Sequence, residues 1–171
     1  MSKSFVHLHA HTEYSMLDGA AKIQTYIDRV KELAQPAAAI TDHGNLYGAL
    51  EFYNIAKKNG VKPIIGYEAY ITTESRFDRP DRDKNKRFHL TLLAENNEGY
   101  WNLVSLASKA FTDGYYYKPR LDYQLLREHS KGLIALSGCL GGEIAQHLAP
   151  DGSVEEGNNQ SERSYQKALD K

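Results

Sequence analysis

Short apolar runs alternate along this chain with longer amphipathic stretches, and this alternation constrains its fold more than any other feature. Residues 22–34 carry apolar side chains at the three-and-four spacing of one helix face, at Ile23, Tyr26, Ile27, Val30 and Leu33. The apolar runs are typical of strands in a parallel sheet that is covered on both faces. The predicted strands are residues 5–9, 37–41, 63–71, 88–94 and 133–137, and the predicted helices are residues 22–34, 46–58, 100–111 and 143–148. We therefore predict the α/β class.

Polar residues suited to chemistry gather where these predicted strands end. His9 and His11 come at the end of the first strand and Asp42 and His43 at the end of the second, Glu68 lies late in the third and His89 in the fourth, and Cys139 follows the fifth. In (β/α) barrels the active site is built at the carboxyl ends of several strands, whereas an open doubly wound sheet gathers it at one switch point. The distribution therefore favours a TIM-like barrel. The chain offers about five βα units where a closed barrel takes about 250 residues, so we expect an incomplete barrel.

Length and composition set broader limits. The 171 residues suit one domain, which we assign to residues 1–150, followed by a polar loop and the start of a helix at residues 151–171. A net charge of -1 gives no bulk attraction to nucleic acid, so any phosphate contact must come from a local patch or from bound metal. One cysteine and the lack of a long apolar run or a signal peptide predict a cytoplasmic protein with no membrane partner.

Histidines at every second position of the first predicted strand indicate a metal site. His7, His9 and His11 would project from one face of an extended segment, and neutral imidazoles are ligands that zinc prefers. His7 lies deeper in the strand, and we interpret it as a hydrogen-bonded core histidine. Asp18, which precedes Gly19, is either a turn residue or a further ligand.

Two further strands add polar groups to the same predicted site. His43 would offer an imidazole at the barrel mouth, with Asp42 orienting a ligand and Gly44 turning the backbone away. Glu68 lies in an apolar strand, where an unpaired carboxylate would be costly. Bridging two metal ions would suit its two oxygens. His89 and Cys139 alone would be interpreted as packing residues, and they become candidate ligands only because the other candidates accompany them.

Residues 115–120 mix aromatic and cationic side chains, as surfaces that stack nucleic-acid bases do. Tyr117, Lys118 and Arg120 are candidate DNA contacts, with ordinary packing as the alternative. His129 and His147 fall in helical or turn segments away from strand ends, and we interpret them as surface residues.

Several segments together resemble the PHP (polymerase and histidinol phosphatase) domains at the N-terminus of bacterial replicative DNA polymerases, the polymerase III alpha subunits. They are His-Leu-His-Ala-His-Thr-Glu-Tyr-Ser-Met-Leu-Asp-Gly, Thr-Asp-His-Gly-Asn-Leu-Tyr-Gly-Ala-Leu-Glu-Phe-Tyr, Lys-Pro-Ile-Ile-Gly-Tyr-Glu-Ala-Tyr, His-Leu-Thr-Leu-Leu-Ala and Leu-Ser-Gly-Cys. The resemblance implies a distorted (βα)7 barrel with up to three divalent metal ions, often zinc, with manganese or iron as alternatives. It assigns metal ligation to His9, His11, Asp18, His43, Glu68, His89 and Cys139, and leaves His7 outside the set. The family's late Asp-x-His pair has no counterpart after Cys139.

The resemblance also implies a function in DNA replication. The metal site would hydrolyse phosphodiesters at a DNA 3′ end, as a 3′–5′ proofreading exonuclease, with His9, His11, Asp18, His43 and Glu68 acting through bound metal and water. Its partners would be the DNA, the remaining polymerase domains and other replisome subunits. The alternative is a non-catalytic, metal-stabilised scaffold that supports the polymerase or docks a separate proofreading subunit. The long match argues against a small-molecule phosphatase, and His89 stands where amidohydrolases usually carry a lysine.

Overall fold

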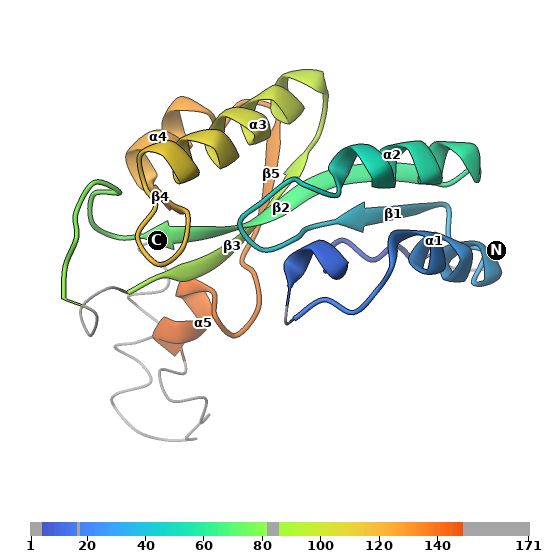
Figure 1. The fold of residues 1–171 in the computed structure, drawn as a ribbon, viewed down its shortest axis with the longest axis horizontal. Helices are drawn as coiled ribbons and strands as arrows, with labels where there is room; N and C mark the ends of the chain where they lie inside the picture. Colours follow the sequence, from blue (N-terminus) through green and yellow to red (C-terminus); the bar gives the residue numbers. More distant parts are fainter. Residues whose placement is uncertain (1–4, 17, 82–85, 149–171) are drawn as a thin grey trace.

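A computed structural model describes residues 5–16, 18–81 and 86–148 (Figure 1). The predicted loop and helix start at residues 151–171 lie outside the described residues. The elements in chain order are η1 (Glu13–Ser15), α1 (Ile23–Glu32), β1 (Ala37–Ile40), α2 (Ala49–Lys58), β2 (Lys62–Thr72), β3 (Phe88–Ala94), α3 (Asn97–Thr112), β4 (Arg120–Asp122), α4 (Tyr123–Glu128), β5 (Leu133–Leu136) and α5 (Glu143–Leu148).

The sheet is mixed, and β2 is its centre. The first half of β2 pairs in parallel with β1, and its second half pairs antiparallel with β3 and in parallel with β4. β5 joins β3 antiparallel, so the path β1-β2-β3-β5 stays open within the described residues. The α/β class is confirmed, but the prediction of an all-parallel sheet is wrong. A parallel return normally needs a crossover helix, and the described residues between β2 and β3 form none.

The prediction of a strand at residues 5–9 is also wrong, because this segment forms no regular strand. The Ala39 amide donates to the His7 carbonyl at 3.1 Å, and the Thr41 amide donates to the Ala10 carbonyl at 2.9 Å. In a regular parallel ladder these two acceptors would be two residues apart, but His7 and Ala10 are three residues apart. The Thr41 hydroxyl bonds the extra residue, because it accepts from the Ala10 amide at 2.8 Å. The segment still runs beside β1.

β4 and α4 were not predicted. The sequence signal for α4 is short, because it consists of Asp122 directly before an apolar helical turn. The Asp122 carboxylate caps this helix by accepting from the Leu125 amide at 2.9 Å. Asn96 caps α3 in the same way through the Gly99 amide, so α3 begins at Asn97 and not at residue 100 as predicted.

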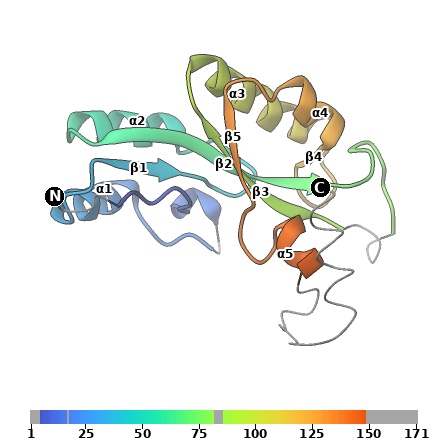
Figure 2. The same cartoon turned by 180° about the vertical axis from the view of Figure 1, so that it is seen from behind.

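Two apolar clusters hold the elements together. One joins α1, β1 and α2 through Ile23, Ile27, Val30, Ala38, Ile40, Phe52, Ala56 and Val61. The other joins β2, β3, α3, β4 and α4 through Tyr67, Ala69, Ile71, Leu92, Leu103, Leu106, Ala107, Ala110, Leu121 and Leu125. Figures 1 and 2 show α2, α3 and α4 on one side of the sheet and α1 and α5 on the other. The predicted helical stripe of α1 is confirmed at Ile23, Ile27 and Val30, which are buried, but not at Leu33, which lies just beyond the helix and is 48% exposed.

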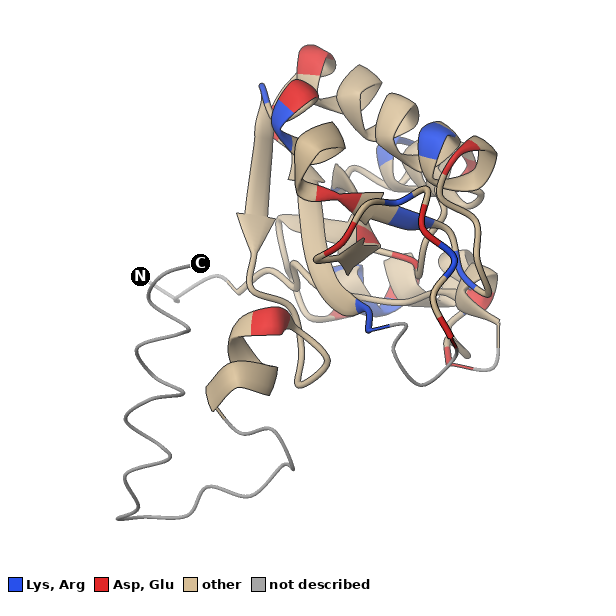
Figure 3. Cartoon of the chain, turned by 90° about the vertical axis from the view of Figure 1, so that its left-hand side faces the viewer, with Lys and Arg blue, Asp and Glu red and all other residues tan. Residues whose placement is uncertain are grey.

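Charge is mixed over the described surface. Figure 3 shows positions of Lys and Arg interspersed with positions of Asp and Glu along the helices and loops, in keeping with the net charge of -1. Among the described residues, no helix is long and apolar enough to cross a membrane.

Candidate metal centre

The pairing of β1 with β2 continues past the end of β1 and places His43 beside Glu68. The Glu68 amide donates to the Asp42 carbonyl at 3.0 Å, and the Gly44 amide donates to the Glu68 carbonyl at 2.8 Å. Gly44 then turns the chain with a φ of +65°, and a Cβ there would lie 2.9 Å from both Pro119 and Tyr70. Only glycine combines this backbone conformation with so little space. The predicted turn at Gly44 is confirmed.

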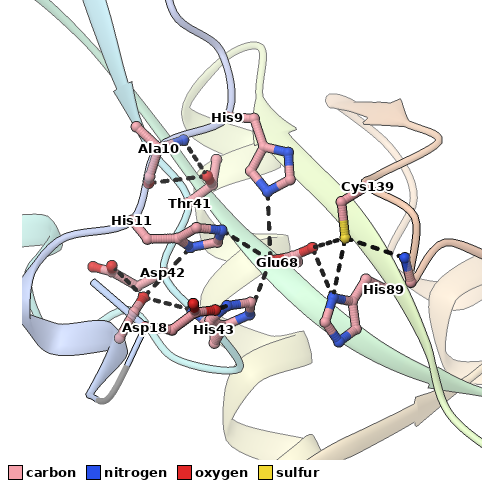
Figure 4. A network of polar contacts seen from close by, with 12 residues as sticks. His9, Ala10, His11, Asp18, Thr41, Asp42, His43, Glu68, His89 and Cys139 are labelled. Atoms are coloured by element: carbon pink, nitrogen blue, oxygen red, sulfur yellow. Dashed lines mark hydrogen bonds and ion pairs between the residues drawn. The ribbon is translucent and has the colours of Figure 1, made fainter. Parts of the chain in front are cut away.

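Glu68 is the centre of the site (Figure 4). Its side chain is fully buried, and its Oε2 lies 3.4 Å from His9 Nε2, 3.2 Å from His11 Nε2 and 2.9 Å from His43 Nδ1. Its Oε1 lies 3.0 Å from His89 Nδ1. Burial alone would raise the pKa of Glu68, but contacts with His11, His43 and His89 lower it well below its ordinary value. The carboxylate is therefore ionised at neutral pH.

Several of the converging atoms are buried without a regular hydrogen bond. They are His9 Nε2, His43 Nδ1 and Glu68 Oε2. Such groups are costly when they face one another without a proton or a cation between them. The ligand atoms of His9, His11 and Glu68 lie within 4.8 Å of one another, and so do those of His43, Glu68 and His89. The residues therefore fit two divalent ions that share the Glu68 carboxylate.

Asp18 and Cys139 lie at opposite ends of this cluster. Asp18 Oδ2 is 2.5 Å from His43 Nε2, although the Asp18 side chain is largely exposed. The close approach of the Glu68 carboxylate raises the pKa of His43, burial opposes this rise, and Asp18 adds to it. Cys139 Sγ lies 3.5 Å from His89 Nδ1 and 3.7 Å from Glu68 Oε1. All the residues predicted as ligands thus meet in one place, and ligation itself stays a prediction.

Asp42 reaches the histidines indirectly, since its carboxylate contacts no imidazole in the described structure. It accepts from the Thr12 amide at 2.6 Å and from the Thr12 and Ser15 hydroxyls at 2.8 and 2.6 Å. Ser15 Oγ in turn accepts from the His43 amide at 3.1 Å and lies 3.5 Å from His11 Nδ1. Asp42 therefore acts on the histidines through Ser15, which the sequence analysis missed. The only sequence signal for Ser15 is its place in the turn directly after His11.

His7 is exposed, so the prediction of a core histidine is wrong. Its segment lies beside β1 at the sheet edge, and its ring contacts Phe5 edge-on at 4.8 Å between centroids. It lies outside both ligand groups.

The prediction that Arg120 contacts DNA is wrong, because only 1% of this residue is exposed. Its guanidinium donates to the carbonyls of Gly114, Arg76 and Asp78, at 3.0, 3.0 and 2.7 Å, and so fixes three loop segments. Lys118 and Tyr117 remain accessible. Lys118 Nζ lies 5.4 Å from the centre of the Tyr70 ring, and Tyr117 is 55% exposed.

The cluster opens into a groove with a volume of about 720 Å³. Asp18, His43 and His89 belong to its lining, together with Tyr70 and Lys118. The remaining lining residues come from the η1 turn, the loop before α2, the end of α3 and the loop after it, and they are Glu13, Tyr14, Ser15, Met16, Asn45, Tyr47, Phe111, Tyr115, Tyr117 and Pro119. A nucleotide-sized ligand could therefore reach the candidate ligands from this side.

Comparison with known proteins places the chain in a family. The model of the PHP domain family matches residues 7–171. The chain is 60% identical over 152 residues to a DNA polymerase III subunit alpha of Thermus aquaticus, and this alignment covers 86% of the chain and 12% of the relative. It is 50% identical over 164 residues to the subunit of the same name from Helicobacter pylori strain J99, and that alignment covers 96% of the chain and 13% of the relative. The chain thus spans about an eighth of the length of these curated relatives.

Solved structures are more distant. A candidate metal-dependent phosphoesterase from Bifidobacterium adolescentis aligns with a TM-score of 0.46 and 19% identity, over 63% of this chain and 33% of that one. An amidohydrolase from Chromobacterium violaceum, with sulfate and no metal bound, aligns with a TM-score of 0.44 and 23% identity, over 61% and 32%.

Proposed function

The chain belongs to the PHP domain family, and we propose that it is the metal-binding domain of a bacterial replicative DNA polymerase and hydrolyses phosphodiesters at a DNA 3′ end. The observation that carries this proposal is the convergence of His9, His11, His43 and His89 on the buried carboxylate of Glu68. The reaction would be that of a 3′–5′ proofreading exonuclease.

The relatives support the proposed setting. Those from Thermus aquaticus and Helicobacter pylori are named as polymerase III alpha subunits. We infer that this chain works in DNA replication in the cytoplasm, beside polymerase domains that carry DNA-directed nucleotidyl transfer. Its partners would then be the DNA 3′ end, those domains and other replisome subunits.

The donor set fits divalent metal. His9, His11 and Glu68 would hold one ion and His43, Glu68 and His89 another, with Asp18 and Cys139 within reach of the cluster. Imidazole and thiol donors favour zinc, while the shared carboxylate also suits manganese or iron. When bound, such ions supply an activated water near neutral pH and neutralise charge on a phosphate.

The side chains of the protein would prepare the site for this chemistry. Glu68 is ionised and buried, so it offers both oxygens to cations. Ser15 accepts from the backbone amide of His43 and lies near His11 Nδ1, and so would help to position both histidines. Lys118 lies above Tyr70 at the groove and can meet a phosphate of the entering strand.

A scaffold role is the second candidate, and one observation favours it. The cluster joins the N-terminal segment, the loop after β1, β2, β3 and the loop after β5. Metal bound there would cross-link these segments whether or not it supports hydrolysis.

One experiment separates the two candidates. Zinc, manganese and iron would be counted per purified chain, and shortening of a 5′-labelled single-stranded oligonucleotide would be followed for the same samples. The double variant His9→Ala/His11→Ala should lose metal and hydrolysis, and the control His129→Ala/His147→Ala should keep both. If the native chain binds metal but does not shorten the oligonucleotide, the exonuclease proposal is contradicted and the scaffold role is supported. The absence of specifically bound metal would contradict both.

A further inference from the structure

A row of exposed aromatic rings lines the groove beside the candidate metal centre. Tyr47, Phe111 and Tyr115 are 67%, 38% and 53% exposed, although they come from the loop before α2, the end of α3 and the loop after it. The ring centroids of Tyr47 and Phe111 lie 6.2 Å apart, and those of Phe111 and Tyr115 lie 6.1 Å apart. Contiguous exposed apolar surface of this kind marks binding sites more often than chance packing.

The local structure ties this row to the metal centre. The side-chain Nδ2 of Asn45 donates to the His43 carbonyl at 2.9 Å, and Asn45 Oδ1 accepts from the backbone amide of Tyr47 at 3.0 Å. Tyr47 is therefore fixed only a few residues from a candidate ligand. All three rings belong to the lining of the groove that also contains Asp18, His43 and His89.

Tyr117 extends the aromatic wall at a strained position. Its φ is +60°, which a bulky residue adopts only at a cost. The turn is held by the Tyr116 amide, which donates to the Lys118 carbonyl at 3.0 Å, and by the Tyr116 hydroxyl, which donates to the Pro80 carbonyl at 2.9 Å. The chain therefore maintains a conformation that exposes Tyr117 and places Lys118 above Tyr70.

We propose that Tyr47, Phe111, Tyr115 and Tyr117 form a stacking surface for the bases of a single-stranded nucleic acid whose backbone passes Lys118 toward the metal centre. The inference rests on the proposed function and names its substrate class. Every base has a π face, so stacking on such rings does not depend on sequence. Bases inside a duplex are already stacked on each other and cannot use the surface. The site would therefore select single strands or frayed 3′ ends.

Binding can be measured apart from hydrolysis. The anisotropy of a 5′-fluorescein ten-nucleotide oligo(dT), titrated with the chain in EDTA at low salt, reports affinity while the metal chemistry is absent. We expect Tyr47→Leu and Tyr115→Leu each to weaken binding by about 10-fold, because stacking on one ring contributes that much. Tyr115→Phe should bind like the native chain since it keeps the ring. Tyr53→Leu is the matched control, an exposed tyrosine of α2 that lies outside this groove. A blunt duplex of the same length should bind more weakly than the single strand.

The outcomes separate this inference from the proposed function. Equal affinities of the native chain, Tyr47→Leu and Tyr115→Leu would overturn the stacking surface, even if the metal-loaded native chain shortens DNA. Loss of binding in these variants would support the stacking surface even if the metal-loaded native chain leaves DNA intact, and the exonuclease proposal alone would then fail. An unfolded variant is recognised by its circular dichroism melting curve. In that case the affinities of the more polar variants Tyr47→Ser and Tyr115→Ser are compared with that of Tyr53→Ser, and the same outcomes support or overturn the stacking surface.

Discussion

At the scale of single residues, the Glu68 carboxylate lies at the centre of the candidate site, and the Ser15 hydroxyl contacts two of the histidines around it. Glu68 faces imidazoles from different segments, and its Oε2 is buried without a regular hydrogen bond, which supports the proposed place of a cation. Its role could be predicted from the sequence because a glutamate in an apolar strand needs a partner. The role of Ser15 could not, because it depends on how the η1 turn folds back onto Asp42.

Ser15→Ala should weaken metal binding without unfolding the chain. The variant loses the hydrogen bond to Asp42, the acceptor for the His43 amide and the neighbour of His11 Nδ1. Groups that orient metal ligands typically contribute about 10- to 100-fold in affinity. A zinc titration against a competing chelator measures the change. Ser130→Ala, which alters an exposed serine bonded to the Arg127 carbonyl, should leave the affinity unchanged. Native affinity in Ser15→Ala would show that Ser15 does not orient the ligands.

At the scale of elements, the register of β1 and β2 brings His43 to Glu68, and Gly44 then ends the pairing. Gly44→Ala should destabilise the chain by about 1–3 kcal/mol from backbone strain, and more from contacts at 2.9 Å with Pro119 and Tyr70. Gly60→Ala is the matched control, since Gly60 has a φ of +74° with no atom within 4 Å of a Cβ. Urea unfolding should show the larger loss for Gly44→Ala. Equal losses would mean that the space around Gly44 does not matter.

The junction of β4 and α4 should make stability depend on pH. Burial would raise the pKa of Asp122, but the amides of Arg76 and Leu125 and the Arg76 guanidinium lower it below its ordinary value. The ionised form therefore stabilises the fold fully above the unfolded pKa of about 4, and this stabilisation declines as the pH falls further. Asp122→Asn keeps the cap acceptor of α4 and loses the ion pair, at a cost of about 3 kcal/mol at neutral pH.

Urea unfolding of the native chain and Asp122→Asn between pH 7 and pH 3 checks this dependence. The difference in the free energy of unfolding should be constant down to about pH 4 and should narrow below it. Asp28→Asn alters an exposed aspartate that bonds Gln24, and it should show no comparable difference. A gap between native and Asp122→Asn that persists unchanged at pH 3 would contradict the assigned pKa direction.

At the scale of the whole molecule, the limits of sequence-based prediction have physical causes. The fold class, the position of His43 directly after β1 and the position of Glu68 in the apolar strand β2 follow from the pattern of apolar and polar residues. The antiparallel direction of β3 does not, because apolar runs carry no direction. The burial of Arg120 was also hidden, since a guanidinium becomes internal only when carbonyls such as those of Gly114, Arg76 and Asp78 converge on it.

The central claim is that Glu68 bridges two divalent-metal sites within one chain. Calorimetric titration of the metal-stripped chain with zinc tests it most directly, with Glu68→Gln as the variant and Glu95→Gln, an exposed glutamate, as the control. We predict binding of two ions by the native chain and by Glu95→Gln, and loss of both sites in Glu68→Gln because each contains this carboxylate. Unchanged stoichiometry in Glu68→Gln, or no zinc binding by the native chain, would contradict the claim.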